Sequence, residues 1–424
     1  MRLLHAVLAL ASLTYSSPTP NGETILHNPA SKRAEWPYAP HVTSGRWIRD
    51  STGKNVTYAG TNWPGHNDVM IPEGLQYQSI ATIVTKIKSL GMNTVRLTFA
   101  IQMIDEIHAN GGNDITIQKA FVQALGQTNG TRVLNQVLAK NPNLTASTTR
   151  LQVFDLVTAE LAKQQIYIVL DNHISKGMWC CSGTDGNTFW GDTYFNAANW
   201  VRGLAYMANH AKSWPAVTAL SLRNEPREPT NNAAARNAYN WQNWYTYMKQ
   251  GSTAVTTANP DLLIVLSGLN YDTTITPVVQ NTALTPGTGR YNKADFPANK
   301  IVLELHNYET GANNCNNLQG NLLRNGFNAL SGTTPNVFPV MLTEFGFQMD
   351  ASTWRNTYST CLASFVTSQK AGWMIWVLAG SYYIRSGTQD YDEGWGLMNH
   401  DWSDWRSPNY VNGLLLSMVK GTLS

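Results

Sequence analysis

Two glutamates occupy positions from which they can carry out acid–base chemistry together. Glu225 follows an apolar run in Leu222-Arg-Asn-Glu-Pro226, and Glu344 follows another in Leu342-Thr-Glu-Phe-Gly346. Each is therefore expected at the carboxyl end of a short β-strand. One protonated carboxyl and one ionised carboxyl can act in turn as proton donor and as nucleophile or electrostatic stabiliser. The sequence thus predicts a site built on two carboxylates.

Polar and aromatic side chains end the other apolar runs as well. Taken singly, each has an ordinary structural explanation as a helix cap, an ion-pair partner or a core aromatic. Their occurrence at the same end of successive strands favours one shared site, in which donors surround the carboxylates and aromatic rings stack on pyranose faces. This set predicts cleavage of glycosidic bonds and comprises Asn62-Trp63, Arg96, Asp171-Asn172-His173, Asn224, Asn270-Tyr271, His306-Asn307-Tyr308 and Trp376.

The two carboxyls must differ in pKa to share such work. Arg96 and Tyr308 are expected to keep one carboxylate charged, while Glu225 beside Asn224 stays protonated. Metal-assisted hydrolysis is the chemical alternative. Its ligands would be Asp171, His173, His306 and Glu344. No His-Glu-x-x-His motif supports this alternative, so we expect neither a metal nor a cofactor.

The strands that position these residues alternate with helical patterns. Residues 79–90 place isoleucine, valine and leucine on one helical face, Gly91 follows as a cap, and residues 232–258 form a longer helical pattern. Eight strands alternating with helices predict a parallel (β/α)8 TIM barrel. A doubly wound sheet is the alternative fold, but the sequence has no Gly-rich phosphate-binding motif after its first predicted strand. The eight predicted strands are residues 56–63, 94–99, 166–172, 217–223, 262–267, 301–306, 340–344 and 372–378.

The barrel is expected to be a single domain, residues 34–424, with an insertion between its second and third strands. Residues 109–147 in this insertion are rich in Asn, Gly, Gln and Thr, and they are expected above or beside the barrel. The loop at residues 179–190 begins and ends with tryptophan and contains Cys180-Cys181. We expect Trp179 in this loop to serve as a sugar platform.

The N-terminus is typical of an exported protein. Arg2 precedes an apolar stretch that is too short to span a membrane, and small residues follow, so residues 1–17 are predicted to be a signal peptide. Lys32-Arg33 predicts a propeptide at residues 18–33. We therefore expect a secreted, extracellular protein without a membrane anchor.

Secretion affects how the cysteines and glycosylation sequons are interpreted. Four cysteines in an oxidising compartment allow three disulfide connectivities, and we favour Cys315 with Cys361 and Cys180 with Cys181. A zinc site is the weaker alternative, because adjacent cysteines lack the usual gap. Asn55, Asn129 and Asn143 begin glycosylation sequons that fit surface positions.

The composition indicates a neutral, hydroxyl-rich ligand. Only 13% of the residues are charged and the net charge is +3. No run of basic residues is present to follow a phosphate backbone, so nucleic acid is not an expected partner. The expected partner is a polysaccharide, oligosaccharide or β-glycoside substrate, and we expect a monomer.

Six short motifs, in order along the chain, resemble those of glycoside hydrolase family 5, whose members are retaining (β/α)8 enzymes. The resemblance implies that Glu225 is the acid/base and Glu344 the nucleophile. It also implies that Asn224 binds the sugar 2-hydroxyl, that Arg96 and Tyr308 orient Glu344, that His173 and His306 line the cleaved sugar's subsite, and that Trp376 forms its floor. The motifs are Asn93-Thr-Val-Arg-Leu97, Leu170-Asp-Asn-His173, Leu222-Arg-Asn-Glu-Pro226, Leu305-His-Asn-Tyr308, Leu342-Thr-Glu-Phe-Gly346 and Gly372-Trp-Met-Ile-Trp376.

The leading prediction is a secreted retaining endo-β-1,4-glucanase of the cellulase type. An exo-acting β-glucosidase or diglycosidase, or a β-mannanase, is the alternative on the same scaffold. The exo alternative is favoured if residues 109–147 or 179–190 block one end of the cleft. A non-catalytic carbohydrate-binding barrel is the least favoured, because both glutamates are present. Residues 380–402 differ from the simplest cellulases and leave the substrate open.

Overall fold

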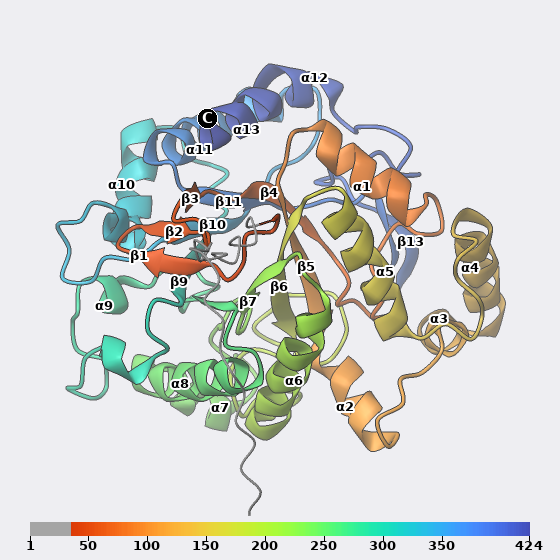
Figure 1. The fold of residues 1–424 in the computed structure, drawn as a ribbon, viewed down its shortest axis with the longest axis horizontal. Coiled ribbons are helices and arrows are strands. Elements are labelled where there is room, and N and C mark those ends of the chain that lie inside the picture. Colours follow the sequence, from red (N-terminus) through yellow and green to blue (C-terminus); the bar gives the residue numbers. More distant parts are fainter. Residues whose placement is uncertain (1–34) are drawn as a thin grey trace, which may run out of the picture. The chain divides into compact units, whose positions relative to one another are not determined.

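The computed structural model describes residues 35–424. The predicted signal peptide (1–17) and propeptide (18–33) lie outside the described residues. Eight parallel strands close into a barrel in the order β10-β11-β4-β5-β6-β7-β8-β9, which confirms the predicted fold (Figure 1). Its strands are β4 (Ala59–Trp63), β5 (Thr94–Ala100), β6 (Tyr167–Ile174), β7 (Val217–Ser221), β8 (Leu263–Leu266), β9 (Ile301–Asn307), β10 (Val340–Phe345) and β11 (Gly372–Ile375).

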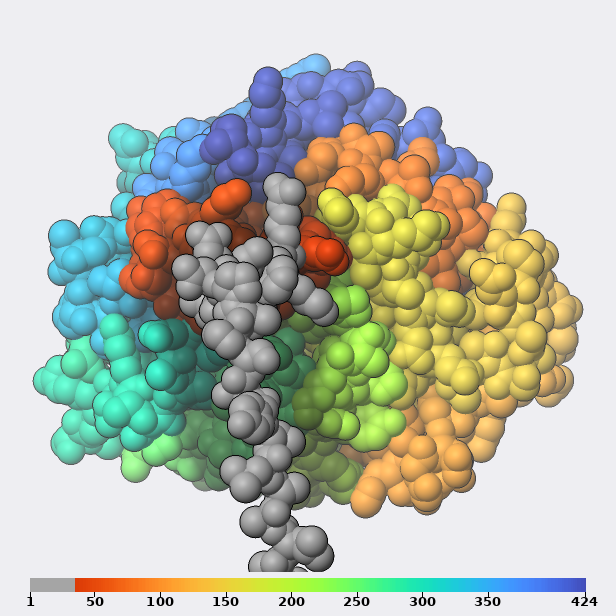
Figure 2. Space-filling view, viewed as in Figure 1, coloured from red at the N-terminus to blue at the C-terminus, as the bar shows by residue number. Residues whose placement is uncertain are grey.

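A small antiparallel sheet packs against the barrel interior near the amino ends of its strands. It consists of β1 (Val42–Ser44), β2 (Trp47–Arg49) and β3 (Asn55–Val56), so the predicted first strand starts later than expected, at Ala59. Ile48 of β2 joins Tyr58, Tyr167 and Val169 in one buried cluster. In Figure 2 the visible red atoms of this N-terminal part lie in the middle of the face, ringed by later segments. This sheet does not cover the opposite end of the barrel, where the carboxyl ends of the strands lie.

Helices between the strands cover the barrel and bury their apolar faces against it. The predicted helix at residues 79–90 is α1 (Ile80–Ser89), with the Ser79 side chain accepting from the Thr82 amide and Gly91 at φ +74°. The others are α2 (Ile101–Ala109), α3 (Ile117–Leu125), α4 (Gln127–Lys140), α5 (Arg150–Lys163), α6 (Ala197–His210), α7 (Ala233–Ala238), α8 (Trp241–Ala258), α9 (Thr276–Val279), α10 (Cys315–Asn325), α11 (Thr357–Gln369), α12 (Pro408–Tyr410) and α13 (Leu416–Leu423).

The long helix predicted at residues 232–258 is two helices, α7 and α8. Tyr239 leaves the helical region with ψ 94°, and the Asn240 side chain accepts a hydrogen bond from the Asn243 amide. Asparagine competes in this way with a continuing helix, because its side chain can satisfy the free amides of a new N-terminus. The periodicity of the apolar residues alone does not reveal this interruption.

The insertion between β5 and β6 packs against a C-terminal hairpin. The hairpin is formed by β12 (Ser381–Arg385) and β13 (Thr388–Asp392). The ring of Phe121 in α3 meets that of Tyr383 edge-on at 5.0 Å, and Gln389 Nε2 donates to the Leu125 carbonyl. Helix α3 of the insertion is therefore joined to this hairpin by packing and by a hydrogen bond. Among residues 35–424, we find no helix with the length and hydropathy needed to cross a membrane.

Candidate active site

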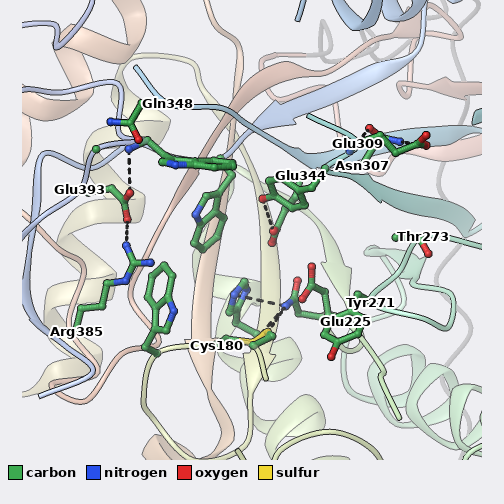
Figure 3. A pocket seen from close by; sticks show the side chains of 18 of the residues that line it. Cys180, Glu225, Tyr271, Thr273, Asn307, Glu309, Glu344, Gln348, Arg385 and Glu393 are labelled. Atoms are coloured by element: carbon green, nitrogen blue, oxygen red, sulfur yellow. Dashed lines mark hydrogen bonds and ion pairs between the residues drawn. A yellow bond between two sulfur atoms is a disulfide. The ribbon is translucent and has the colours of Figure 1, made fainter. Parts of the chain in front are cut away.

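Most of the predicted site residues come together in one cleft at the carboxyl ends of the barrel strands. The cleft has a volume of about 950 Å³, at the upper end of the range for small-molecule sites. Figure 3 shows Glu225 and Glu344 facing this cleft, with aromatic rings to one side of them. The predicted residues that line it are His173, Trp179, Cys180, Cys181, Asn224, Glu225, Tyr271, Asn307, Tyr308, Glu344 and Trp376.

The two glutamates are close neighbours. One carboxylate oxygen of Glu225, one of Glu344 and a ring nitrogen of His306 all lie within 4.8 Å of one another. His306 Nδ1 is 2.9 Å from Glu225 Oε1 and 3.6 Å from Glu344 Oε2. Burial lowers the pKa of His306, while the charge of Glu344 opposes that shift. Because their oxygens lie this close together, the two carboxyls can act on opposite sides of one bond of a ligand.

Glu344, on β10, is held at both oxygens. Arg96 Nη1 donates to its Oε1 at 2.7 Å, and the Tyr308 hydroxyl donates to its Oε2 at 3.0 Å. Arg96 is fully buried beneath the cleft and also lies 3.0 Å from Asp171. Burial raises the pKa of Glu344 to about 7, while His306 and Arg96 oppose that rise.

Glu225 follows β7 in a backbone conformation that non-glycine residues seldom adopt, with φ +46°. Such conformations are often found at functional sites, where the surrounding fold holds them. Burial raises the pKa of Glu225 to about 7, with Arg227 as the main opposing charge. The two carboxyls are thus not separated in pKa as the sequence predicted, because both are buried. The donors that Arg96 and Tyr308 direct at Glu344 favour the ionised form of that carboxyl.

Asn224 is fixed between a guanidinium and a disulfide. Its Oδ1 accepts from Arg96 Nη2 at 2.9 Å, and its Nδ2 lies 3.6 Å from Cys181 Sγ and 3.9 Å from Cys180 Sγ. Since the amide oxygen is engaged below, the amide nitrogen is presented at the cleft. The structure joins Cys180 to Cys181 at this wall and joins Cys315 to Cys361 between α10 and α11.

Trp376 follows β11 and forms an aromatic floor beside the glutamates. His173 stacks against it with ring centroids 5.3 Å apart, and Asp171 Oδ2 is 2.6 Å from His173 Nδ1. Trp179 meets the Trp376 ring edge-on at 6.2 Å. Gly346 is required beside this floor, because a Cβ there would lie 2.4 Å from the Trp376 carbonyl oxygen.

Three predicted substrate residues lie elsewhere than expected. Trp63 is fully buried and donates through Nε1 to the Glu73 carbonyl, so it is a core residue and its predicted substrate role is wrong. Arg96 and His306 lie behind the cleft wall and reach the glutamates instead of an open subsite. A strand-end position does not decide which way a side chain faces, because alternate residues point into and out of the barrel.

Several residues of the site were missed by sequence reasoning. Asp272 lies behind His306, with its Oδ2 3.6 Å from Nε2, and burial raises its pKa well above the usual range. Arg385, Glu393 and Trp395 line the cleft from the segment that the sequence marked only as unusual. The run Asp392-Glu-Gly-Trp395 was the only sequence feature that could have pointed to these residues. Its local sequence does not show that the segment lies beside the cleft.

The metal-ligand set considered from the sequence is not brought together. Asp171 engages His173 and Arg96, and Arg96 also supplies positive charge to Glu344. Within residues 35–424, three other groups have metal-ligand spacing: His173 with Cys180 and Cys181; Glu225 with His306 and Glu344; and Asp272 with Glu304 and His306. The first contains disulfide sulfurs, which are not thiolate ligands. In the third, Arg96 lies 3.7 Å from Glu304 and supplies a positive charge beside it.

The glycosylation sequons lie away from this cleft. Asn55 and Asn143 are exposed, and Asn129 in α4 is partly exposed. None of the three lines the cleft.

Comparison with known proteins supplies the family context for this geometry. A family model described as Cellulase (glycosyl hydrolase family 5) matches residues 49–381. A glycosyl hydrolase 5 family protein from Chamaecyparis obtusa is 35% identical over 390 residues. That match covers 88% of this chain but only 65% of the relative, so the chain spans less than two thirds of that relative's length. An endoglucanase from Paenibacillus polymyxa is 23% identical, with 90% and 88% of the two chains covered.

Two solved structures share the fold. The catalytic domain of the major endoglucanase from Xanthomonas campestris pv. campestris has a TM-score of 0.63 and 23% identity, covering 90% of this chain and 99% of that one. A cellotetraose complex of an endocellulase from Pyrococcus horikoshii has a TM-score of 0.65 and 17% identity, with the same coverage. At these identities the two structures establish a common fold.

Proposed function

This chain belongs to glycosyl hydrolase family 5, and we propose that it hydrolyses β-linked glucans by a double displacement that retains the anomeric configuration. The observation that carries the proposal is the spacing of the two carboxyls, with oxygens of Glu225 and Glu344 within 4.8 Å. Retaining enzymes hold their carboxyl groups about 5–5.5 Å apart, whereas inverting enzymes leave about 6.5–9.5 Å for a water molecule. The short spacing favours direct attack by a carboxylate.

In the first step Glu344 attacks the anomeric carbon while Glu225 gives its proton to the departing glycosidic oxygen. The bond from the anomeric carbon to that oxygen breaks, and a glycosyl ester to Glu344 forms. In the second step Glu225 takes a proton from water, the water oxygen attacks the same carbon, and Glu344 leaves as a carboxylate. Arg96 and Tyr308 donate to the two oxygens of Glu344 and orient it for both steps.

The remaining residues hold the sugar. Asn224 lines the cleft, and its amide oxygen is already engaged by Arg96. Its amide nitrogen is therefore the group that can donate a hydrogen bond to a sugar hydroxyl. Trp376 offers an apolar ring on which a pyranose face stacks, and His173 supports that ring from behind. These contacts position the anomeric carbon between the two carboxyls.

The proposed substrate is a β-1,4-linked glucan. This rests on two relatives named as endoglucanases and on a structural neighbour that is a cellotetraose complex of an endocellulase. Endo action is the mode that the sequence analysis favours, and the two relatives named as endoglucanases support it as well. Exo action is the second candidate mode, and the ion pair between Arg385 and Glu393 at one side of the cleft favours it.

We also propose that the protein is a secreted monomer. Secretion is supported by the N-terminal sequence, by two disulfides among residues 35–424 and by a relative named as a major extracellular endoglucanase. The exposed sequons at Asn55 and Asn143 are compatible with passage through a glycosylating compartment.

A panel of substrates tests this function. The purified protein should release sugars from carboxymethylcellulose, mixed-linkage glucan and aryl β-cellobioside, and Glu344→Ala should abolish turnover on all three while leaving oligosaccharide binding intact. Turnover only on β-mannan would contradict the substrate class. Near-normal activity of Glu344→Ala would contradict the assignment of the nucleophile.

A further inference from the structure

The two sides of the cleft differ in character. Figure 3 places Tyr271 and Thr273 on one side of the two glutamates and Arg385 and Glu393 on the opposite side. Tyr271 is 37% exposed, and its amide donates to the carbonyl of Pro226, next to Glu225. Because Glu225 protonates the departing oxygen, the leaving part of the substrate lies on the Tyr271 side. The sugar that stays bound to Glu344 extends over Trp376 toward Arg385.

A continuous series of contacts stands on this second, glycone side. Trp179 meets Trp376 edge-on, and the Arg385 guanidinium lies 3.6 Å over the Trp179 ring. Arg385 Nη1 donates to Glu393 Oε2 at 2.6 Å, and Glu393 Oε1 accepts from the Trp395 amide at 3.0 Å. We refer to Trp179, Arg385, Glu393 and Trp395 as the glycone wall.

The ion pair in the glycone wall is not a solvated surface pair. The Glu393 side chain is only 3% exposed and that of Arg385 22%. A pair that is partly withdrawn from water, with a planar guanidinium stacked on an indole, keeps its geometry better than an exposed one. The pair therefore presents fixed charged groups to this side of the cleft.

The hairpin that carries Arg385 is anchored from behind. The amide of Tyr383 in β12 donates to the buried carboxyl of Glu73 at 2.7 Å, and its hydroxyl donates to the Pro72 carbonyl. On the other strand, the Tyr77 hydroxyl donates to the Asp390 carboxylate. Helix α3 packs against the same hairpin through Phe121. The insertion therefore supports the glycone wall without lining the cleft.

We propose that the glycone wall closes the cleft on its non-reducing side, so that this enzyme removes short units of one or two sugars from chain ends, in place of the endo action that the names of its relatives suggest. Trp376 and Trp179 offer aromatic rings along this path, between the glutamates and the Arg385–Glu393 pair. The charged pair then offers donors and acceptors to the hydroxyls of a terminal sugar. The proposal rests on the glucan hydrolysis proposed above and specifies where in the chain it occurs.

Product analysis of the unaltered protein tests the proposal. Cello-oligosaccharides reduced at one end distinguish the products from the two ends of the chain. The expected early products are a single short sugar from the non-reducing end and an alditol shortened by the same unit. An aryl cellotrioside blocked at its non-reducing end by a bulky acetal should release no phenol. Products of several lengths from the start, or rapid cleavage of the blocked substrate, would overturn the proposal.

Two variants test the residues of the wall. Arg385→Ala removes the guanidinium, and Glu393→Gln keeps the shape of its partner while removing the charge. Both are expected to raise the ratio of viscosity loss to new reducing ends on carboxymethylcellulose at least about fivefold and to admit the blocked substrate. Arg355→Ala is the matched control, because Arg355 also lies over a tryptophan ring, at 4.5 Å from Trp354, but lines no part of the cleft.

The outcomes separate this inference from the function on which it rests. If neither the glucans nor the aryl glycosides are hydrolysed, the proposed function fails. If glucans are hydrolysed and folded Arg385→Ala and Glu393→Gln keep the product pattern of the unaltered protein, the glycone wall does not set the mode of attack. A melting temperature within a few degrees of the parent identifies a variant as folded.

Discussion

Replacement of Tyr308 by phenylalanine isolates one hydrogen bond of the proposed nucleophile. The hydroxyl donates to Glu344 Oε2 at 3.0 Å, whereas the ring also contacts Trp395 and keeps its place without the hydroxyl. A hydrogen bond to a charged group is worth about 1.5–3 kcal/mol, which corresponds to a rate loss of about 10- to 150-fold. We expect Tyr308→Phe to lower kcat/KM on aryl β-cellobioside within that range.

The same variant should change the pH dependence. The hydroxyl favours the ionised form of Glu344, so its loss raises the pKa of that carboxyl and moves the acidic limb of the kcat/KM profile upward. Tyr58→Phe is the control: its hydroxyl lies 2.8 Å from both His41 and Thr218, at the opposite end of the barrel. It should lose stability without losing rate. A Tyr308→Phe rate within a factor of two of the parent would refute the proposed role of this hydroxyl.

Three further expectations concern the acid/base, the pH optimum and the thiols. Glu225→Ala should retain cleavage of aryl glycosides with acidic phenols and regain turnover with azide, measured as phenol release; no azide effect would argue against the acid/base role. Because burial raises the pKa of Glu225 and Glu344 to about 7, activity should rise as Glu344 ionises, fall as Glu225 loses its proton, and peak near neutral pH in a kcat/KM profile. A maximum near pH 4 would contradict that environment. Thiol titration of the denatured, unreduced protein should find no free cysteine, and recovery of four thiols would exclude both disulfides.

The sequence was sufficient for the barrel because each strand is a short apolar run bounded by polar residues. Each of the eight predicted runs overlaps a barrel strand, with four strands ending one or two residues later than predicted, and the capped helix after Ser79 begins and ends within a residue of its predicted limits. The interruption at Tyr239 and Asn240 was missed, since the apolar spacing continues through it. Capping by a side chain is a local competition that periodicity does not record.

The site was predictable where chemistry depends on strand ends and unpredictable where it depends on long-range packing. Glu225 and Glu344 share one cleft because parallel strands deliver their carboxyl ends to one face. Trp63 also ends a strand but faces the core and was placed wrongly. The contact between Arg385 and Trp179 brings together segments that are distant in sequence, so no local sequence pattern predicts it.

Trapping of the glycosyl-enzyme tests the central claim most directly. A 2-deoxy-2-fluoro-β-cellobioside with an activated leaving group slows the second step more than the first, so a covalent ester should accumulate. Mass spectrometry of the intact protein should show one added 2-deoxy-2-fluorocellobiosyl unit, and peptide mapping should place it on Glu344. An adduct on another residue, or no adduct together with products of inverted configuration by NMR, would contradict the double displacement proposed for Glu225 and Glu344.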